Sequence, residues 1–355
     1  MNVIVIGGGP AGSLAATLLA RAGAAVTLLE QSRFPRDKVC GECLSALGRQ
    51  VLQRHGLEGP LSVAGHELTH ARLVGPSTSV RLKLPEPMLG MSRAALDHTL
   101  LNAARSAGAI IRQPARAETI ESDQMSVNVR VRCLETNRVT DEIADMVLTA
   151  DGRATFADRR PAATADLGVK AHFVGVTAEP EAITLYGGIG CYGGVAQIED
   201  GRWNVAFSIP KSRVAAARGN LDAVWADLLV ASPAMARHFA YAERTTDWLA
   251  APLPRFAPLK HWPARVFPIG AAACAIEPVG GEGMGTALRS AELAVEAILA
   301  DRTSSLAADY EQLWHRRSLF CRLGGRMLAN ERLSEVAQLA ENETIARAAM
   351  WAVGK

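Results

Sequence analysis

Short apolar runs alternate along the chain with segments of helical periodicity, and residues 3–30 show this pattern most clearly. Residues 3–6 (VIVI) are apolar throughout, which is typical of a strand buried on both faces. Residues 13–21 have helical periodicity and are followed by Gly23, a residue type that often ends a helix. Residues 25–29 (AVTLL) are a second apolar run. The pattern predicts a βαβ unit, in which a helix joins two parallel strands.

The turn between the first strand and the helix has the glycine spacing G-x-G-x-x-G. Gly7 permits a tight bend, Gly9 lets the backbone approach a pyrophosphate, and Gly12 lets the helix pack closely on the strand. The free N–H groups and the dipole at the start of the helix favour a diphosphate there. Glu30 follows the second strand, where an acid accepts the hydroxyl groups of an adenosine ribose and repels a 2′-phosphate. The segment predicts a bound dinucleotide, FAD or NAD rather than NADP.

The same two patterns predict the elements in the rest of the chain. Helical periodicity predicts helices at residues 45–54, 93–106, 221–229 and 283–300, and from 306 onward. Apolar or alternating runs predict strands at residues 109–111, 125–133, 145–149, 169–176, 183–186, 194–198, 203–209 and 266–269. Residues 67–83 predict a hairpin around Gly75-Pro76-Ser77, and residues 199–202 (EDGR) predict a hairpin turn.

The composition and charge of the chain restrict its partners. With 355 residues and 49% hydrophobic content the chain can bury a large core, and its formal net charge of +2 is too small to predict a nucleic-acid partner. No apolar stretch reaches the roughly twenty residues of a bilayer span, and no leader precedes the first strand. Six scattered cysteines are typical of a reducing compartment, so we expect a cytoplasmic protein without a stable membrane span.

Two of the cysteines form the C-x-x-C sequence Cys40-Gly41-Glu42-Cys43. No second pair follows at zinc spacing, and the surrounding pattern is not thioredoxin-like. We therefore expect no metal, with a redox dithiol as the alternative.

The last helical segment carries an apolar stripe beside several arginines. Leu313, Phe320, Leu323 and Met327 share one helical face. The neighbouring arginines are Arg316, Arg317, Arg322 and Arg326. We expect this helix to pack on its own domain with its arginines in solvent, and docking on a membrane surface is the alternative.

Four further segments accompany the glycine turn. Arg33 precedes Lys38-Val39-Cys40-Gly41-Glu42 in the first of them. The other three are Arg93, Asp97 and Leu100 with the spacing R-x-x-x-D-x-x-L, Ala150-Asp151-Gly152, and residues 268–284 (PIGAAACAIEPVGGEGM). In this order the motifs resemble those of the FAD-dependent monooxygenase and geranylgeranyl reductase superfamily, whose members are built like p-hydroxybenzoate hydroxylase. The resemblance covers nearly the whole chain.

The resemblance implies an α/β fold with a Rossmann-like FAD-binding domain of the glutathione-reductase type, built on a mostly parallel sheet. An antiparallel-sheet substrate domain is interleaved with it, and helices follow at the C-terminus. We expect the FAD-binding domain at residues 1–65, 92–165 and 264–303. The substrate sheet is expected at residues 66–91 and 166–263, and the C-terminal helical segment at 304–355.

The resemblance also implies where FAD is held. Arg33 and Arg93 can donate charge-assisted hydrogen bonds to phosphate or ribityl oxygens. The helix that begins at Gly283 can direct free N–H groups to the pyrimidine side of the isoalloxazine, where negative charge develops on reduction. The expected cofactor-binding residues are Gly7, Gly9, Pro10, Ala11, Gly12, Glu30, Gln31, Arg33, Lys38, Cys40, Gly41, Arg93, Asp151, Gly152, Gly270, Ala271, Pro278, Gly280, Gly281, Gly283 and Met284.

One position departs from the family pattern. Ala271 stands where the family has an aspartate that accepts a hydrogen bond from the ribityl chain. A hydrogen bond to a charged acceptor is worth roughly 1.5 to 3 kcal/mol, or about one to two powers of ten in affinity. We therefore expect FAD to bind through the other motifs, but more weakly.

The superfamily implies an FAD-dependent oxidoreductase. No second G-x-G-x-x-G joins a strand to a helix, so either NAD(P)H visits transiently as the reductant or a separate protein partner reduces the flavin. Residues 192–198 (YGGVAQI) depart from the aromatic-rich Y-x-W-x-F-P-K of the reductase branch, and no convincing W-x-W-x-I-P of the halogenase branch is present. The segment resembles instead bacterial FAD oxidoreductases that hydroxylate lipophilic scaffolds. This resemblance implies a monooxygenase that hydroxylates or epoxidises a lipophilic or aromatic, natural-product-type molecule through a flavin C4a-hydroperoxide.

Two alternatives accompany this prediction. The first is an FAD-dependent double-bond reductase like geranylgeranyl reductase, which would turn over without oxygen. The second is a flavin-free binding protein on the same fold, which the alanine at position 271 would favour.

Three side chains are candidates for catalysis. His172 and Tyr192 belong to strands that we expect to face the substrate cavity, and Glu282 lies in the glycine-rich turn, where an acid can relay protons near the flavin. A single histidine in a strand is also typical of a hydrogen-bonded structural residue.

Overall fold

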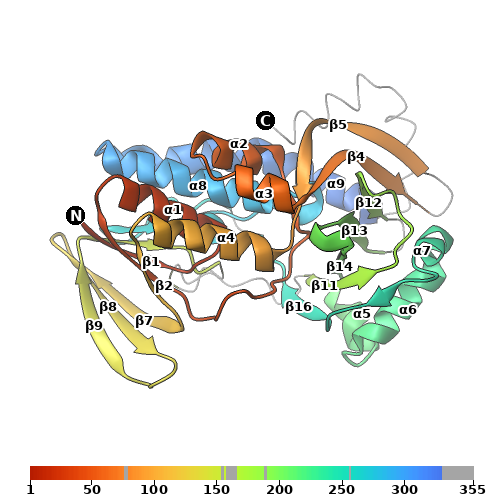
Figure 1. Cartoon of the computed structure of the whole chain (residues 1–355), viewed down its shortest axis with the longest axis horizontal. Helices are drawn as coiled ribbons and strands as arrows, with labels where there is room; N and C mark the ends of the chain where they lie inside the picture. The colour runs from red at the N-terminus through yellow and green to blue at the C-terminus, as the bar shows by residue number, and fades with distance from the viewer. Residues whose placement is uncertain (76–78, 153–155, 157–165, 188–189, 256, 330–355) are drawn as a thin grey trace.

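The computed structural model describes the chain except for residues 76–78, 153–155, 157–165, 188–189, 256 and 330–355. The described part contains three β-sheets (Figure 1). A parallel sheet and the helices that cover it form one end of the molecule, and a larger, mainly antiparallel sheet forms the other end.

Five strands form the parallel sheet. They are β1 (Asn2–Ile6), β2 (Ala25–Leu29), β6 (Ile110–Arg112), β10 (Met146–Thr149) and β17 (Val266–Pro268), in the order β17-β10-β1-β2-β6. Every neighbouring pair runs parallel. The sheet gathers strands that are far apart in the sequence, and it confirms the predicted βαβ unit and α/β fold.

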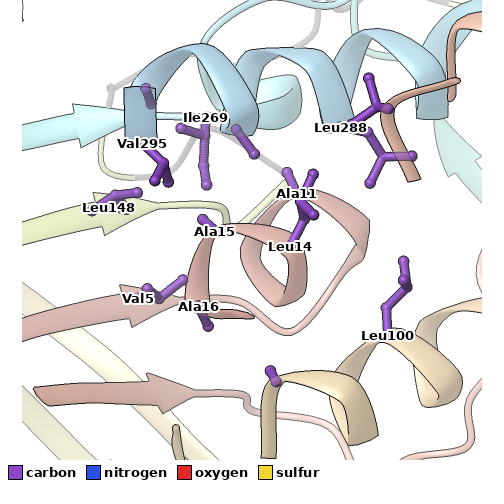
Figure 2. Close-up of a cluster of buried hydrophobic side chains, with 14 of the residues drawn as sticks. Val5, Ala11, Leu14, Ala15, Ala16, Leu100, Leu148, Ile269, Leu288 and Val295 are labelled. Carbon is purple, nitrogen blue, oxygen red and sulfur yellow. The ribbon is translucent and has the colours of Figure 1, made fainter. Parts of the chain in front are cut away.

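Three helices cover one face of this sheet. They are α1 (Pro10–Arg21), α4 (Arg93–Ser106) and α8 (Glu282–Leu299). Leu14 of α1, Leu288 of α8 and Val5 of β1 belong to one buried cluster (Figure 2). This core fixes the position of α1 relative to α8. The first helix begins at Pro10, earlier than its apolar periodicity predicted, because proline needs no N–H partner in the first turn.

A three-stranded antiparallel sheet covers the opposite face of the parallel sheet. Its strands are β7 (Ala115–Ser122), β8 (Val127–Cys133) and β9 (Val139–Ala144). Ile4 and Ile6 of β1 pack with Val129 of β8 in one cluster. Of these three strands, the sequence analysis predicted only β8. It missed β7 and β9, because both carry charged residues at several exposed positions.

The nine-stranded second sheet supplies the other half of the molecule. Its strands are β3 (Cys43–Leu44), β4 (His66–Val74), β5 (Ser79–Gly90), β11 (Leu167–Val174), β12 (Ala182–Tyr186), β13 (Tyr192–Gln197), β14 (Trp203–Ile209), β15 (Glu243–Arg244) and β16 (Leu249–Pro252). Most pairs are antiparallel, but β12 runs parallel to β4.

Both predicted hairpins are present in this sheet. β4 and β5 pair antiparallel, although the sequence prediction ended at residue 83 and β5 continues to Gly90. Residues 76–78 of the predicted turn lie outside the described part of the chain. A single 3-10 turn at Glu199–Gly201 joins β13 to β14, as the EDGR sequence predicted.

The remaining helices pack around these sheets. They are α2 (Ala46–Arg54), α3 (Gly59–Ala64), α5 (Lys211–Ala216), α6 (Leu221–Ala231), α7 (Pro233–His238) and α9 (Leu306–Ala329). The aromatic rings of Phe173, Trp225 and Phe239 join α6 and α7 to β11. Among the described residues, no helix is both long and apolar enough to cross a bilayer.

The predicted packing of α9 on its own domain is confirmed, but one of its arginines is not in solvent. Tyr310 and Leu313 belong to the same buried cluster as α1 and α8. Arg322 and Arg326 are exposed, whereas Arg317 is buried, with its Nε 3.9 Å from the carboxylate of Glu282 on α8. The sequence pattern could not predict this contact, because it depends on how α9 packs on α8.

Candidate active site

A cavity of about 1290 Å³ lies between the glycine turn after β1 and the second sheet. Its walls come from the start of α1, the segment 37–43, residues 270–287 and strands β4, β5 and β11–β14. The C-terminal half of α9 closes another side. Segments from both ends of the chain therefore meet around one space.

Most of the expected cofactor-binding residues line this cavity. They are Gly9, Pro10, Ala11, Lys38, Cys40, Gly41, Arg93, Gly152, Gly270, Ala271, Pro278, Gly280, Gly281, Gly283 and Met284. The turn near the N-terminus and the turn near residue 280 thus face the same space, as the motifs require for one shared cofactor.

The glycines provide the shape that a flat, extended cofactor needs. A Cβ on Gly12 would lie only 1.9 Å from the carbonyl oxygen of Gly7, so only glycine allows this close packing of helix on strand. At Gly41 and Gly283, both in the cavity wall, no atom of the described residues beyond the adjoining backbone lies within 4 Å of where a Cβ would be. The absence of these side chains leaves open space in the cavity, which fits a cofactor that lies against the backbone.

Cations gather beside the glycine turn. The guanidinium of Arg93 binds both carboxylate oxygens of Asp97, at 2.8 and 2.7 Å. Burial alone would lower the pKa of Arg93, but Asp97 holds it above its ordinary value. Burial, together with Arg93 and Arg36, lowers the pKa of Lys38 to about 8. A diphosphate placed here would relieve the repulsion among these cations, so the group fits the phosphates of FAD.

Arg36 is a functional candidate that the sequence analysis missed. Its side chain lies 3.1 Å from Asp97 and 3.9 Å from Glu30, and it is only 17% exposed. Arg33, which was expected to contact the cofactor, instead pairs with Glu135 at the surface, and neither arginine lines the cavity. Both arginines precede the KVCGE sequence, and only the path of the chain decides which one turns inward.

Several other expected site residues do not line the cavity. Glu30 accepts hydrogen bonds from the backbone N–H groups of Gly8 (2.8 Å) and Ser32 (2.7 Å), so its carboxylate anchors the glycine turn. Gln31 accepts a hydrogen bond from Arg116 at the surface. The residues outside the cavity lining are Gly7, Gly12, Glu30, Gln31, Arg33, Asp151 and His172.

The three catalytic candidates have different surroundings. His172 is buried and contacts Glu42 through Nε2 at 2.6 Å, which agrees with the structural alternative for this histidine. Tyr192 lines the cavity, and its hydroxyl group donates to Glu277, while burial raises the pKa of the phenol.

Glu282 is the candidate with an environment suited to proton transfer. It lines the cavity at the start of α8, and it is only 4% exposed. Ser45 donates a hydrogen bond to its carboxyl group at 3.2 Å, and Arg317 lies 3.9 Å away. Burial raises the pKa of Glu282 to about 7, against the smaller opposing effects of Arg317 and Ser45. The group therefore exchanges a proton in the neutral pH range.

The surroundings of the C-x-x-C sequence do not favour a reactive dithiol. Cys40 and Cys43 are both unbonded, and burial raises the pKa of the Cys43 thiol far above its ordinary value. A thiol that stays protonated is a poor nucleophile. Cys40 lines the cavity and accepts a weak hydrogen bond from the Glu42 N–H.

An apolar compartment adjoins the glycine-lined part of the cavity. β4, β5 and β12 contribute one wall with Leu73, Leu82, Leu84, Ile183 and Leu185. The stripe of α9 that was expected only to pack on its domain contributes Phe320, Leu323 and Met327, and the last two are partly exposed there. Alternating strand positions predict a buried face, but the sequence does not tell which faces enclose a cavity.

The FAD binding domain family matches residues 1–188 of this chain. The chain belongs to this FAD-binding family. This flavoprotein is also a member of the predicted superfamily of FAD-dependent monooxygenases and geranylgeranyl reductases.

Curated relatives of this flavoprotein include reductases of lipophilic molecules. It is 26% identical to digeranylgeranylglycerophospholipid reductase 2 of Methanopyrus kandleri, over 98% of this chain and 92% of that protein. It is 37% identical to menaquinone reductase of Mycolicibacterium smegmatis over 28% of this chain and 24% of that protein. Conditioned medium factor receptor 1 of Dictyostelium discoideum is 28% identical over 45% of this chain. The matched region covers 24% of the menaquinone reductase and 34% of the receptor. This chain therefore spans about a third or less of the length of these two relatives.

Solved structures share the whole fold. A flavin-dependent brominase matches with a TM-score of 0.84 and 18% identity, over 100% of this chain and 94% of that one. A geranylgeranyl bacteriochlorophyll reductase-like protein from Thermoplasma acidophilum matches with a TM-score of 0.79 and 22% identity, over 99% and 95% of the two chains. The comparisons therefore show an FAD-binding protein with a Rossmann-type fold, and the family match favours bound FAD over the flavin-free alternative.

Proposed function

We propose that this flavoprotein reduces a carbon–carbon double bond in a lipophilic, largely aliphatic molecule. The observation that carries the proposal is Glu282, a buried carboxyl group in the cavity wall whose pKa is raised to about 7. Reduction of a double bond needs a proton as well as a hydride, and a protonated acid beside the substrate can supply it. Bound FAD supplies the hydride in such a reaction.

The apolar compartment supports the proposed substrate class. Its wall is built largely from branched aliphatic side chains, including Leu73, Leu82 and Leu185. Burial of apolar surface stabilises a bound aliphatic chain by about 25 cal/mol per Å². The full-length curated relative is named as a reductase of a lipid with geranylgeranyl chains, which agrees with this substrate class.

Three residues share the handling of the proton. Glu282 holds it on a carboxyl oxygen, and the Ser45 hydroxyl group orients that carboxyl group through a 3.2 Å hydrogen bond. After transfer to the substrate carbon, the guanidinium of Arg317 stabilises the carboxylate that remains. Exchange with solvent water then restores the proton. As the source of electrons, we propose NAD(P)H as a transient reductant, with a separate flavin-reducing protein as the alternative.

Monooxygenation of a lipophilic or aromatic substrate is the second candidate. It is favoured by β13, where Tyr192, Gly193 and Gly194 line the cavity and the aromatic residues of the reductase branch are absent. An oxygenating flavoprotein needs no proton donor of the Glu282 kind, because the flavin supplies most of the reactivity.

One experiment separates the two reactions. FAD-loaded protein is incubated with NADPH and geranylgeraniol, with and without oxygen, and the products are analysed by mass spectrometry. Double-bond reduction predicts NADPH oxidation without oxygen and a product that has gained two hydrogens. A product that gains one oxygen atom, formed only in air, contradicts the proposal and supports the monooxygenase. NADPH oxidation under neither condition contradicts the proposed reductant.

A further inference from the structure

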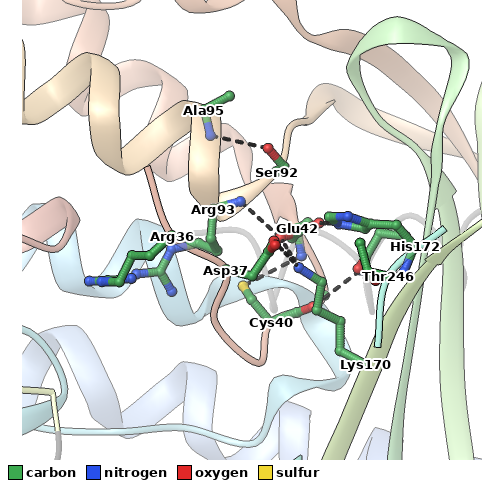
Figure 3. A network of polar contacts seen from close by, with 12 residues as sticks. Arg36, Asp37, Cys40, Glu42, Ser92, Arg93, Ala95, Lys170, His172 and Thr246 are labelled. Atoms are coloured by element: carbon green, nitrogen blue, oxygen red, sulfur yellow. Dashed lines mark hydrogen bonds and ion pairs between the residues drawn. The ribbon is translucent and has the colours of Figure 1, made fainter. Parts of the chain in front are cut away.

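A buried polar network connects the segment 37–42, which passes along the cavity, to the second sheet (Figure 3). Glu42 is its centre, with no exposed surface. The Glu42 carboxylate accepts hydrogen bonds from Lys170 Nζ at 2.7 Å and from the backbone N–H of Arg93 at 2.8 Å, and it contacts His172 Nε2 at 2.6 Å. Lys170 and His172 come from β11, so the second sheet reaches across to the cofactor side of the cavity.

The network contains a cation, the ammonium group of Lys170. Asp37, Glu42 and His172 place their ligand atoms within 4.8 Å of one another, as a metal site would. Lys170 Nζ already lies 2.9 Å from Asp37 and 2.7 Å from Glu42. The ammonium group therefore already binds both carboxylates of this group, and it balances the charge of the buried Glu42.

A second strand of the same sheet also contacts this segment. Asn204 on β14 is paired in register with His172 on β11, and its amide donates to the carbonyl oxygen of Cys40 at 3.1 Å. Among the described residues, neither His172 Nδ1 nor Asn204 Oδ1 has a hydrogen-bond partner, although both atoms are buried.

The backbone of the segment needs such support. Glu42 has a φ of +55°, in the left-handed region that a residue with a side chain rarely adopts. Strained conformations of this kind persist only when surrounding contacts fix them. Three side chains from β11 and β14 supply these contacts here: Lys170, His172 and Asn204.

We propose that Lys170, His172 and Asn204 form a clamp that positions the Cys40–Gly41 backbone against bound FAD. They are positioning residues, because they act through Glu42 and through the Cys40 carbonyl group. Lys170 has a second effect, since its charge prevents Glu42 from presenting an uncompensated negative charge to the flavin as the flavin is reduced. The inference rests on FAD binding in this cavity and not on the proposed double-bond reduction, so the two can fail separately.

The first test removes the histidine contact and then restores it. His172→Leu loses the Nε2 contact with Glu42, whereas His172→Gln keeps an N–H donor at a similar position. Tyr186→Phe is the matched control, because Tyr186 is fully buried in the same sheet and bonds His238 on the side of α7. FAD affinity is measured by titration, and the order of the segment by hydrogen exchange of the amides at residues 38–42.

The clamp predicts a specific pattern of results. His172→Leu weakens FAD binding by about tenfold and speeds exchange at residues 38–42, while His172→Gln recovers most of both losses. Tyr186→Phe changes neither quantity. The proposal is overturned if folded His172→Leu binds FAD within twofold of the parent with unchanged exchange, or if Tyr186→Phe loosens FAD equally. If His172→Leu does not fold, Asn204→Ala decides in the same way, since it removes a single hydrogen bond to the segment.

The second test measures the reduction potential of the bound flavin. Lys170→Met keeps the length of the side chain and removes its charge. The clamp predicts a lower potential, because a negative charge on Glu42 opposes electron uptake by the flavin. A double variant, Lys170→Met with Glu42→Gln, should return the potential toward the parent value. An unchanged potential in the single variant contradicts the charge role of Lys170.

Discussion

Glu42 and Glu282 are buried carboxyl groups beside the same cavity, but their surroundings differ. Glu42 has three donors within 2.8 Å, one of them an ammonium group. Glu282 has a hydroxyl group at 3.2 Å and a guanidinium nitrogen only at 3.9 Å. The first environment provides the donors that an ionised carboxylate needs, and the second raises the pKa of Glu282 to about 7. Both groups are buried, so burial does not distinguish them. The number and distance of the hydrogen-bond partners distinguish Glu42, a structural carboxylate, from Glu282, the proposed proton donor.

The largest expected effect is on catalysis at Glu282. Glu282→Gln keeps the shape of the side chain but removes its transferable proton, so we expect turnover to fall by about 10²- to 10⁴-fold. FAD affinity should stay within about twofold of the parent, because Glu282 makes no charge contact that FAD requires. Turnover with geranylgeraniol and FAD titration measure the two quantities. Full activity in this variant contradicts the assignment of Glu282 as the proton donor.

The next effect concerns stability at Glu42. Lys170→Met leaves the buried Glu42 without its cation, and breaking a buried pair in this way costs about 3–5 kcal/mol of unfolding free energy. Urea unfolding of the parent and the variant at pH 7 measures the difference. A loss below about 1 kcal/mol, typical of a surface pair, would show that Lys170 is not the partner that Glu42 requires.

Urea unfolding of a Glu282 variant should show a gain in unfolding free energy, in contrast to the loss expected for Lys170→Met. The pKa of Glu282 is about 7 in the folded protein against an ordinary 4.5. The folded protein therefore keeps this proton to higher pH than the unfolded chain, and stability present below pH 4.5 is lost as the pH rises through about 7. Glu282→Gln removes this penalty and stabilises the protein at pH 8, by up to about 3 kcal/mol. Urea unfolding at pH 8 and at pH 4.5 tests it, because the gain should vanish at the lower pH.

A smaller effect is expected when a carboxyl group is added to the cavity. Ala271 lines the cavity where the family has an aspartate. Ala271→Asp should tighten FAD binding by about one to two powers of ten, since the new carboxylate accepts a hydrogen bond from the ribityl chain. Ala271→Asn, which has a weaker acceptor, is the matched control. Unchanged affinity in the aspartate variant would mean that this position does not reach the ribityl chain.

The smallest effect is expected at an exposed ion pair. Arg130 and Asp141 lie 3.1 Å apart on β8 and β9, and both are about half exposed. Arg130→Met should change the unfolding free energy by less than about 1 kcal/mol and leave FAD affinity unchanged. A loss as large as that of Lys170→Met would contradict the distinction between buried and exposed carboxylates.

The sequence predicted the cofactor side of the molecule better than the substrate side. The glycine spacing and the apolar runs on either side of the first helix are local, so the βαβ unit could be placed to within a few residues. Side chains from β4, β5, β12 and α9 form the apolar compartment. The sequence of each element predicts that one of its faces is buried, but not that these faces enclose a cavity together. Arg33 and Arg36 show that sequence cannot predict the location of single side chains either. They are only three residues apart, but Arg36 is mostly buried beside Asp97 and Arg33 is exposed beside Glu135.

The chain by itself determined the βαβ unit and the order of the motifs that predict the family, because each motif consists of residue types at short, fixed spacing. Tertiary structure alone decided the surroundings of the two glutamates. Glu42 meets Lys170 and His172 across more than a hundred residues, and Glu282 meets Ser45 from the far end of the chain. Electrostatic environment depends on distances in space, and those distances are set only when the sheets and helices pack together.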